Sequence, residues 1–80
     1  MSSYYVQYSN RARSEYNGLP ANVRRDFDSA VSFMARNPYA HGAAIRGDKD
    51  RRSACLGGVI TEYEISSSVL VVTMLKLVSI

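Results

Sequence analysis

The stretch that decides the fold is the C-terminal segment 57–80, GGVITEYEISSSVLVVTMLKLVSI. It holds two strand-like runs, 59–65 and 69–78, and each run follows a turn of small residues, Gly57-Gly58 or 66–68. The second run is almost wholly apolar and is broken only by Thr73 and Lys76. A strand whose alternate residues are all apolar is covered on both faces, so we predict that it lies inside a sheet.

The first run, 59–65, alternates instead. Its odd positions read Val59, Thr61, Tyr63 and Ile65, and its even positions read Ile60, Glu62 and Glu64. Successive side chains of a strand point to opposite faces, so this pattern predicts one dry face and one wet face. We expect the functional residues on the wet face of the sheet, and Tyr63 on the dry face with its hydroxyl near the edge.

Upstream of this segment, turn and cap signals divide the chain into short elements. A strand is predicted over 4–8, followed by a helix over about 11–17 that is capped by Ser9-Asn10 and ended by Gly18. A second helix is predicted from 20 to about 36, where Asn37-Pro38 ends it. A short strand over 43–46, a turn over 47–50 and a return strand over 51–56 complete the chain.

These elements predict an α+β fold in the order β-α-α-β-β-β-β. The second helix has one apolar stripe, formed by Val23, Phe27, Ala30, Val31 and Met34 at helical spacing. We therefore expect two N-terminal helices to pack on one face of a twisted, mainly antiparallel sheet of four to five strands, with the other face open. At 80 residues the chain is expected to form a single domain, 1–80.

Composition excludes several classes of protein. A hydrophobic fraction of 46% with 21% charged residues indicates a folded rather than a disordered chain, and the net charge of +3 is too small to imply general nucleic-acid coating. A single cysteine, Cys55, excludes an intrachain disulfide, and nothing in the sequence supports a metal or a cofactor. The N-terminus does not resemble a signal peptide and no run can span a membrane, so a cytoplasmic protein is expected.

The only concentrated charge lies in the segment 46–52, RGDKDRR. Its cations are Arg46, Lys49, Arg51 and Arg52, which could hold phosphates, because a guanidinium group can bind a phosphate with two hydrogen bonds. The alternative is a solvated turn whose charges pair with one another.

Four further residues are candidates for catalysis. His41 is the sole histidine, and Glu62 lies on the wet face, where a carboxylate can act as a general base. Either His41 or the Tyr63 hydroxyl could serve as the acid. Lys76 interrupts an apolar strand, and because a buried lysine is costly, it is expected to reach the open face or the rim of the sheet.

In this order the motifs resemble the RelE/ParE superfamily of type II toxins. The matching segments are YYVQYS, EYNGLPANVRRDF, FMARNPYA, AIRG and VITEYEI, followed by the apolar last strand. The resemblance implies that the first strand lies beside the last, and that a cognate antitoxin wraps the protein in a toxin–antitoxin hetero-oligomer. RelE-like members are endoribonucleases that cut mRNA on the ribosome, whereas ParE-like members inhibit DNA gyrase.

The resemblance also sets the candidate site. RelE-like nucleases carry an arginine three positions before the tyrosine that matches Tyr63, and this chain has Ile60 there. The candidates for catalysis are therefore Arg46, Arg51, Arg52, Glu62, Tyr63, Lys76 and His41. With RNA as the ligand that the resemblance implies, the candidates for RNA binding are Arg46, Lys49, Arg51 and Arg52. The leading function is a RelE-like mRNA interferase. The alternative, favoured by Ile60, is a non-catalytic binding module with the toxin fold or a ParE-like gyrase inhibitor.

Overall fold

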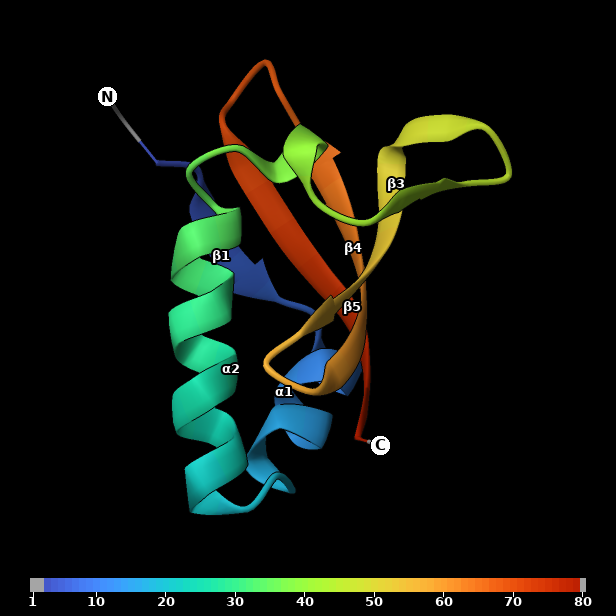
Figure 1. The fold of residues 1–80 in the computed structure, drawn as a ribbon. Helices are drawn as coiled ribbons and strands as arrows, with labels where there is room; N and C mark the ends of the chain where they lie inside the picture. Colours follow the sequence, from blue (N-terminus) through green and yellow to red (C-terminus); the bar gives the residue numbers. More distant parts are fainter. Residues whose placement is uncertain (1–2, 80) are drawn as a thin grey trace.

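The computed structural model describes residues 3–79 and contains two α-helices, one short 3-10 helix and five strands (Figure 1). The elements are β1 (Tyr5–Tyr8), α1 (Asn10–Asn17), α2 (Ala21–Met34), η1 (Pro38–Ala40), β2 (Ala43–Ile45), β3 (Asp48–Leu56), β4 (Val59–Ser66) and β5 (Val71–Ser79). The predicted order of helices and strands is confirmed.

The strands form one mixed sheet in the order β1-β5-β4-β3-β2. β1 runs parallel to β5, and the other neighbouring pairs are antiparallel. The apolar strand β5 lies between β1 and β4, as its sequence predicts, and the first strand lies beside the last, as the family resemblance implies. The expectation that both faces of β5 are covered is wrong, because only the face with Val72, Met74 and Leu77 is buried and Val78 on the other face is 42% exposed.

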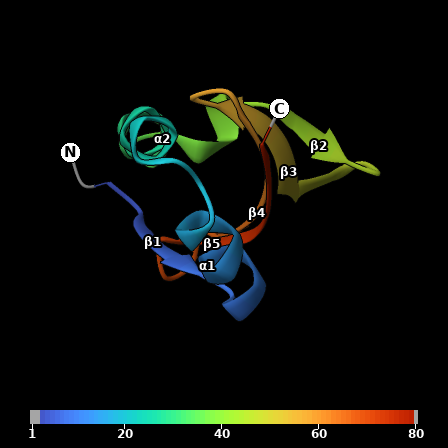
Figure 2. The ribbon, with the colours of Figure 1, turned by 90° about the horizontal axis from the view of Figure 1, so that it is seen from below.

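Both helices lie on the same face of the sheet. Figure 2 shows the sheet curving from β1 round to β3, with α2 on its inner side. Phe27, Val31 and Met34 of α2 are buried against the strands, together with Ala12 of α1. The strands contribute Ala54, Leu56, Val59, Tyr63, Ile65, Val72, Met74 and Leu77 to this core. The prediction of one covered face is therefore confirmed.

Hydrogen bonds tie α1 to the interior strand β5. The Ser9 side chain caps the helix by accepting from the Ala12 backbone N–H at 3.1 Å, and its hydroxyl lies 3.3 Å from the Leu75 carbonyl oxygen. Near the other end of α1, the Glu15 carboxylate accepts the backbone N–H of Leu77 at 2.9 Å. These contacts fix the register of α1 along β5, because both ends of the helix bond to the same strand.

Three predicted boundaries are wrong by a few residues. α2 begins after Pro20, which is its N-cap, and ends at Met34 rather than near Arg36, because Pro38 starts η1 shortly afterwards. β5 begins at Val71 rather than 69, since Leu70 has a φ of 57° and belongs to the preceding turn.

The turn between β2 and β3 also differs from the prediction of a turn over 47–50. β3 already begins at Asp48, and the turn consists of Arg46 and Gly47 alone, with Ile45 paired to Asp48. Both turn residues have positive φ, 53° and 79°. Two-residue turns with this backbone suit the twist of a hairpin, which explains why the strand resumes at once.

The turn between β3 and β4 packs against α2. Gly57 has a φ of 59°, and a Cβ atom there would meet the backbone of Asp26 and Phe27 at 2.7 Å. Gly58 has a φ of 83°, but a Cβ atom there would meet nothing within 4 Å. Because Gly57 has no side chain, the backbone of the turn can touch the backbone of the helix. Gly58 makes no such close approach.

We predict that Gly57→Ala destabilises the protein much more than Gly58→Ala. Both substitutions force alanine into a left-handed conformation, at about 1–2 kcal/mol. Gly57→Ala also drives its methyl group into α2, which raises the total loss to about 3–4 kcal/mol. Urea unfolding of the two variants measures the difference, and equal losses would show that the approach of the turn to α2 is unimportant.

Candidate functional site on the open sheet face

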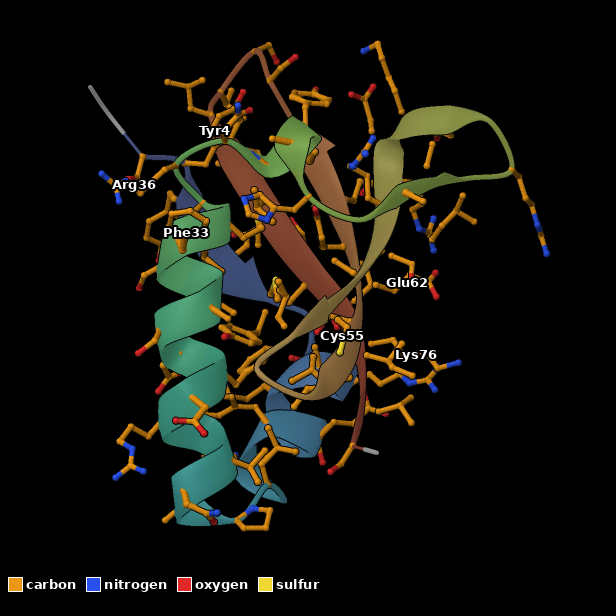
Figure 3. All side chains as sticks on the ribbon, viewed as in Figure 1. Tyr4, Phe33, Arg36, Cys55, Glu62 and Lys76 are labelled. Carbon is orange, nitrogen blue, oxygen red and sulfur yellow. The ribbon has the colours of Figure 1, made fainter. Side chains whose placement is uncertain are left out.

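The face of the sheet away from the helices is uncovered among the residues that the structure describes, and three rows of side chains cross it. Strand register aligns Cys55, Ile60 and Val78 in one row, Ser53, Glu62 and Lys76 in the next, and Arg51, Glu64 and Thr73 in the third. Figure 3 shows Cys55, Glu62 and Lys76 on the side of the sheet opposite α2. The wet face predicted from the alternation of β4 is therefore confirmed.

A β-bulge explains where Lys76 lies. In β5 the buried positions are Val72, Met74 and then Leu77, so the alternation changes phase between Met74 and Leu77. The pairing with β4 changes phase at the same place, because Tyr63 pairs with Met74 while Glu62 pairs with Lys76, and Leu75 is left over. A bulge of this kind turns the next side chain to the other face. Lys76 consequently lies opposite Glu62 on the open face, as the cost of burying lysine requires.

A concavity of about 430 Å³ opens at the hairpin end of this face. It is lined by Ile45, Arg46, Asp48, Arg51 and Glu62. The Arg51 guanidinium lies 3.5 Å from the Glu62 carboxylate, and both side chains are partly exposed. The Asp48 carboxylate faces its own strand and accepts the Asp50 backbone N–H at 3.0 Å. The structure thus brings Arg46, Arg51 and Glu62 together. Lys76 lies beside Glu62 in the same row, on the neighbouring strand β5.

Arg52 lies on the opposite face from Arg51 and has a structural role. Its guanidinium donates to the backbone carbonyls of His41 at 2.9 Å, Lys49 at 3.2 Å and Gly42 at 3.3 Å. The bonds to His41 and Gly42 fasten the loop before β2 to β3, whereas the Lys49 carbonyl belongs to β3 itself. Arg52 is therefore not placed in the concavity with Arg46 and Arg51.

Tyr63 is fully buried on the helix side. Its hydroxyl donates to the Pro38 carbonyl at 2.9 Å and lies 3.2 Å from the His41 carbonyl. Burial raises the pKa of Tyr63, although the nearby Arg52 charge opposes the shift. The hydroxyl holds η1 and the following loop in place, at the edge of the core as expected, and does not reach the open face.

His41 is separated from the concavity as well. Its ring meets the exposed Phe33 ring edge-on, with centroids 5.4 Å apart, beside the C-terminal end of α2. His41 and Tyr63 thus lie on the helix side, whereas the concavity opens on the other face.

Lys49 belongs to a separate surface cluster on the hairpin. Its ammonium lies 3.3 Å from the Asp50 carboxylate and 5.4 Å from the centre of the Tyr39 ring. The Tyr39 hydroxyl donates to the same carboxylate at 2.6 Å. These two donors, the tyrosine first, lower the pKa of Asp50. Lys49 is exposed, but it does not line the concavity.

The half of the open face toward the Gly57-Gly58 turn is apolar. Ile60 and Val78 are 46% and 42% exposed, and the thiol of Cys55 completes their row. Sequence reasoning missed Val78, Ile45 and Asp48 as residues of this face. Alternation along β3 would place Asp48 on the helix side with Arg52, but the register of β2 and β3 shifts between Ala44 and Ile45, so Asp48 lines the concavity. Val78 likewise cannot be placed without the bulge in β5.

Neither a metal site nor a membrane span is found among the described residues. No group of three or more His, Cys, Asp or Glu side chains in 3–79 could hold a metal ion. Within the same range, no helix is both long and apolar enough to cross a bilayer.

Solved structures share this fold over nearly the whole chain. A chain of the toxin–antitoxin complex RelBE2 from Mycobacterium tuberculosis aligns with a TM-score of 0.87 and 22% identity, covering 100% of this chain and 94% of that one. The isolated RelE toxin of E. coli aligns at 0.81 and 21%, covering 96% and 84%. A chain of the archaeal RelE–RelB complex from Pyrococcus horikoshii aligns at 0.78 and 20%, covering 98% and 96%. The predicted RelE-like fold is confirmed, although no protein-family model and no curated protein sequence matches the chain.

The two adjacent arginines of β3 make a testable pair. We predict that Arg52→Ala lowers the free energy of unfolding by about 2 kcal/mol, because three backbone carbonyls lose their donor. Arg51→Ala should change it by no more than about 0.5 kcal/mol, because its single ion pair is exposed to water. Chemical denaturation of both variants measures the contrast, and similar losses would contradict the separation of the two side chains onto opposite faces.

Proposed function

We propose that this protein is the toxin of a type II toxin–antitoxin pair and acts in the cytoplasm as a ribosome-dependent mRNA interferase that a cognate antitoxin neutralises. The observation that carries the proposal is the RelE fold over the whole chain, combined with a concavity on the open face where Arg51 and Glu62 lie together. Lys76, opposite Glu62 in the strand register, adds a second cation.

These side chains can be assigned the roles that metal-free RNA cleavage needs. Glu62 takes the proton of a ribose 2′-hydroxyl, whose oxygen then bonds to the adjacent phosphorus. Arg51 stabilises the negative charge that develops on the phosphate oxygens. The bond from phosphorus to the 5′-oxygen breaks as Lys76 donates a proton to that oxygen. The products are a 2′,3′-cyclic phosphate and a 5′-hydroxyl, so atoms and charge balance without a metal.

Arg52, Tyr63 and His41 are left out of this assignment. All three lie on the helix side of the sheet, where Arg52 and Tyr63 bond to backbone carbonyls and His41 packs against Phe33. The acid role first considered for His41 or Tyr63 therefore passes to Lys76 in the proposal.

A second candidate function rests on the apolar row of the same face. Ile60 occupies the position of the RelE-like arginine, and Cys55 and Val78 extend the apolar surface on both sides. Apolar side chains bind a protein surface better than a phosphate. This observation favours a toxin that binds its target without cleavage, with DNA gyrase as the ParE-like example.

Primer extension on transcripts after induced expression tests the proposal. We expect new 5′ ends at fixed codon positions, suppressed when the neighbouring gene is expressed at the same time. Glu62→Gln should reduce cleavage about 100-fold, because a general base contributes that much or more. Glu64→Gln is the matched control on the same strand and face, and it should cleave like the wild type.

Two results would count against the proposal in different ways. Intact mRNA with growth arrest and an induced DNA-damage response would favour the gyrase alternative. Normal growth and intact mRNA, with or without the neighbouring gene, would contradict a toxin of either kind.

A further inference from the structure

The β2–β3 hairpin is divided by a break in its pairing. At its base Ala44 pairs with Arg52, but the next pair outward is Ile45 with Asp48. Three residues of β3 are skipped between these pairs and have no partner on β2. Such an interruption removes ladder hydrogen bonds and lets the strand bend. The four residues beyond the break, 45–48, form the tip of the hairpin.

The other neighbour of β3 does not support the skipped residues either, apart from the last of them. The register of β4 with β3 begins at the pair Arg51 and Glu64. In the part of the sheet that the structure describes, Lys49 and Asp50 therefore pair with neither neighbouring strand. These two residues join the tip to the rest of the sheet without ladder bonds, so they form a hinge about which the tip can turn.

Side chains hold this hinge in its observed position. The Asp50 carboxylate accepts a hydrogen bond from the Tyr39 hydroxyl at 2.6 Å and lies 3.3 Å from the Lys49 ammonium. Tyr39 belongs to η1 and packs against the core, and the Tyr63 hydroxyl bonds to the carbonyl of Pro38 at the start of η1. The bond between Tyr39 and Asp50 thus connects the hinge to a segment that the core holds in place.

The concavity lies between the tip and the rest of the sheet, and its charges are divided evenly. Arg46 and Asp48 line it from the tip, whereas Arg51 and Glu62 line it from the sheet. Each wall thus offers one cation and one carboxylate. Within residues 3–79 no ion pair joins the two walls, because Arg51 and Glu62 pair with each other. This arrangement favours closure of one wall on the other, since every charge of the tip finds an opposite charge on the sheet.

We propose that the tip of the β2–β3 hairpin is a flap with two positions, and that the bond between Tyr39 and Asp50 latches it open. In the closed position the charges of the tip pair with Glu62 and Arg51, the two groups to which RNA cleavage is assigned. The flap is thus an autoinhibitory device of the free protein. Its effect on cleavage rests on the proposed function, whereas the motion itself does not.

The distance between position 47 and the native Cys55 reports where the flap stands. Gly47 lies in the turn of the tip, where a Cβ atom would meet nothing within 4 Å, and Cys55 is exposed on the open face. Spin labels on Gly47→Cys and on Cys55 give the distribution of distances by double electron–electron resonance. We expect a main long distance and a minor short one. The short distance should fade at about 1 M salt, which screens ion pairs between exposed groups.

Two substitutions should move the flap in opposite directions. Tyr39→Phe removes the latch but keeps the ring that packs on the core. The ratio of short to long distances should rise about tenfold, the usual effect of losing a hydrogen bond to a charged group. Adding Asp48→Asn removes one closing ion pair and should lower the ratio by about threefold. Tyr5→Phe is the matched control and should match the wild type, because Tyr5 is exposed on β1, at the other edge of the sheet.

The same variants connect the flap to cleavage. In the primer-extension experiment, Tyr39→Phe should cut less mRNA than the wild type, and adding Asp48→Asn should restore part of the loss. If Tyr39→Phe shifts the distances but an active wild type and this variant cleave equally, the flap does not inhibit and the autoinhibitory part is wrong.

The distances decide the inference separately from the proposed function. If Tyr39→Phe gives the same distances as Tyr5→Phe, or if neither salt nor Asp48→Asn changes the short distance, the inference is wrong whatever the activity. If the distances shift as expected while the wild type cleaves no RNA, the flap stands and the proposed function is overturned.

Discussion

The open face of this protein depends on one irregularity in the interior strand β5. Side chains of a regular strand alternate, so the burial of Val72 and Met74 in β5 would carry Lys76 into the core as well. An unpaired charge there would cost far more than the strand gains from its other contacts. The bulge at Leu75 resolves the conflict, because it turns Lys76 outward opposite Glu62 and returns Leu77 to the core. The same residue that breaks the apolar pattern is thus the one that the bulge brings to the candidate site.

The alternation of side chains along β3 gives the adjacent residues Arg51 and Arg52 different roles. Arg51 and Arg52 are neighbours in the chain, so their side chains leave the strand on opposite faces. Arg51 meets Glu62 on the open face, whereas Arg52 donates to three carbonyls on the helix side. Arg52 fixes the loop that leads into β2, and β2 supplies Ile45 to the concavity wall. Arg52 therefore supports the part of the backbone from which the candidate site residues Arg46 and Arg51 project.

The order of elements, the covered face and the interior position of β5 could be predicted because they follow from residue patterns within single segments. The helix stripe around Phe27 and the alternation of 59–65 are examples. The bulge at Leu75 and the two-residue turn at Arg46 could not, because each depends on how two strands pair. The separation of His41 and Tyr63 from Glu62 could be predicted only for Tyr63. The parity of Tyr63 placed it on the dry face from sequence alone, but His41 lies in a loop whose course only the tertiary contacts decide.

The open face is chemically divided, and this division explains why a shared fold does not decide the activity. The row of Glu62 and Lys76 runs between a charged half at the β2–β3 hairpin and an apolar half of Cys55, Ile60 and Val78. The fold likeness, at 20–22% identity, fixes the backbone under both halves but not their side chains. A phosphate needs the charged half, because only there can its charge be matched as water is removed. A protein surface gains most from the apolar half, where desolvation is favourable. The half that binds the target therefore distinguishes the two candidate activities. The β2–β3 hairpin, whose turn consists of Arg46 and Gly47, extends beyond the rest of the sheet (Figure 1).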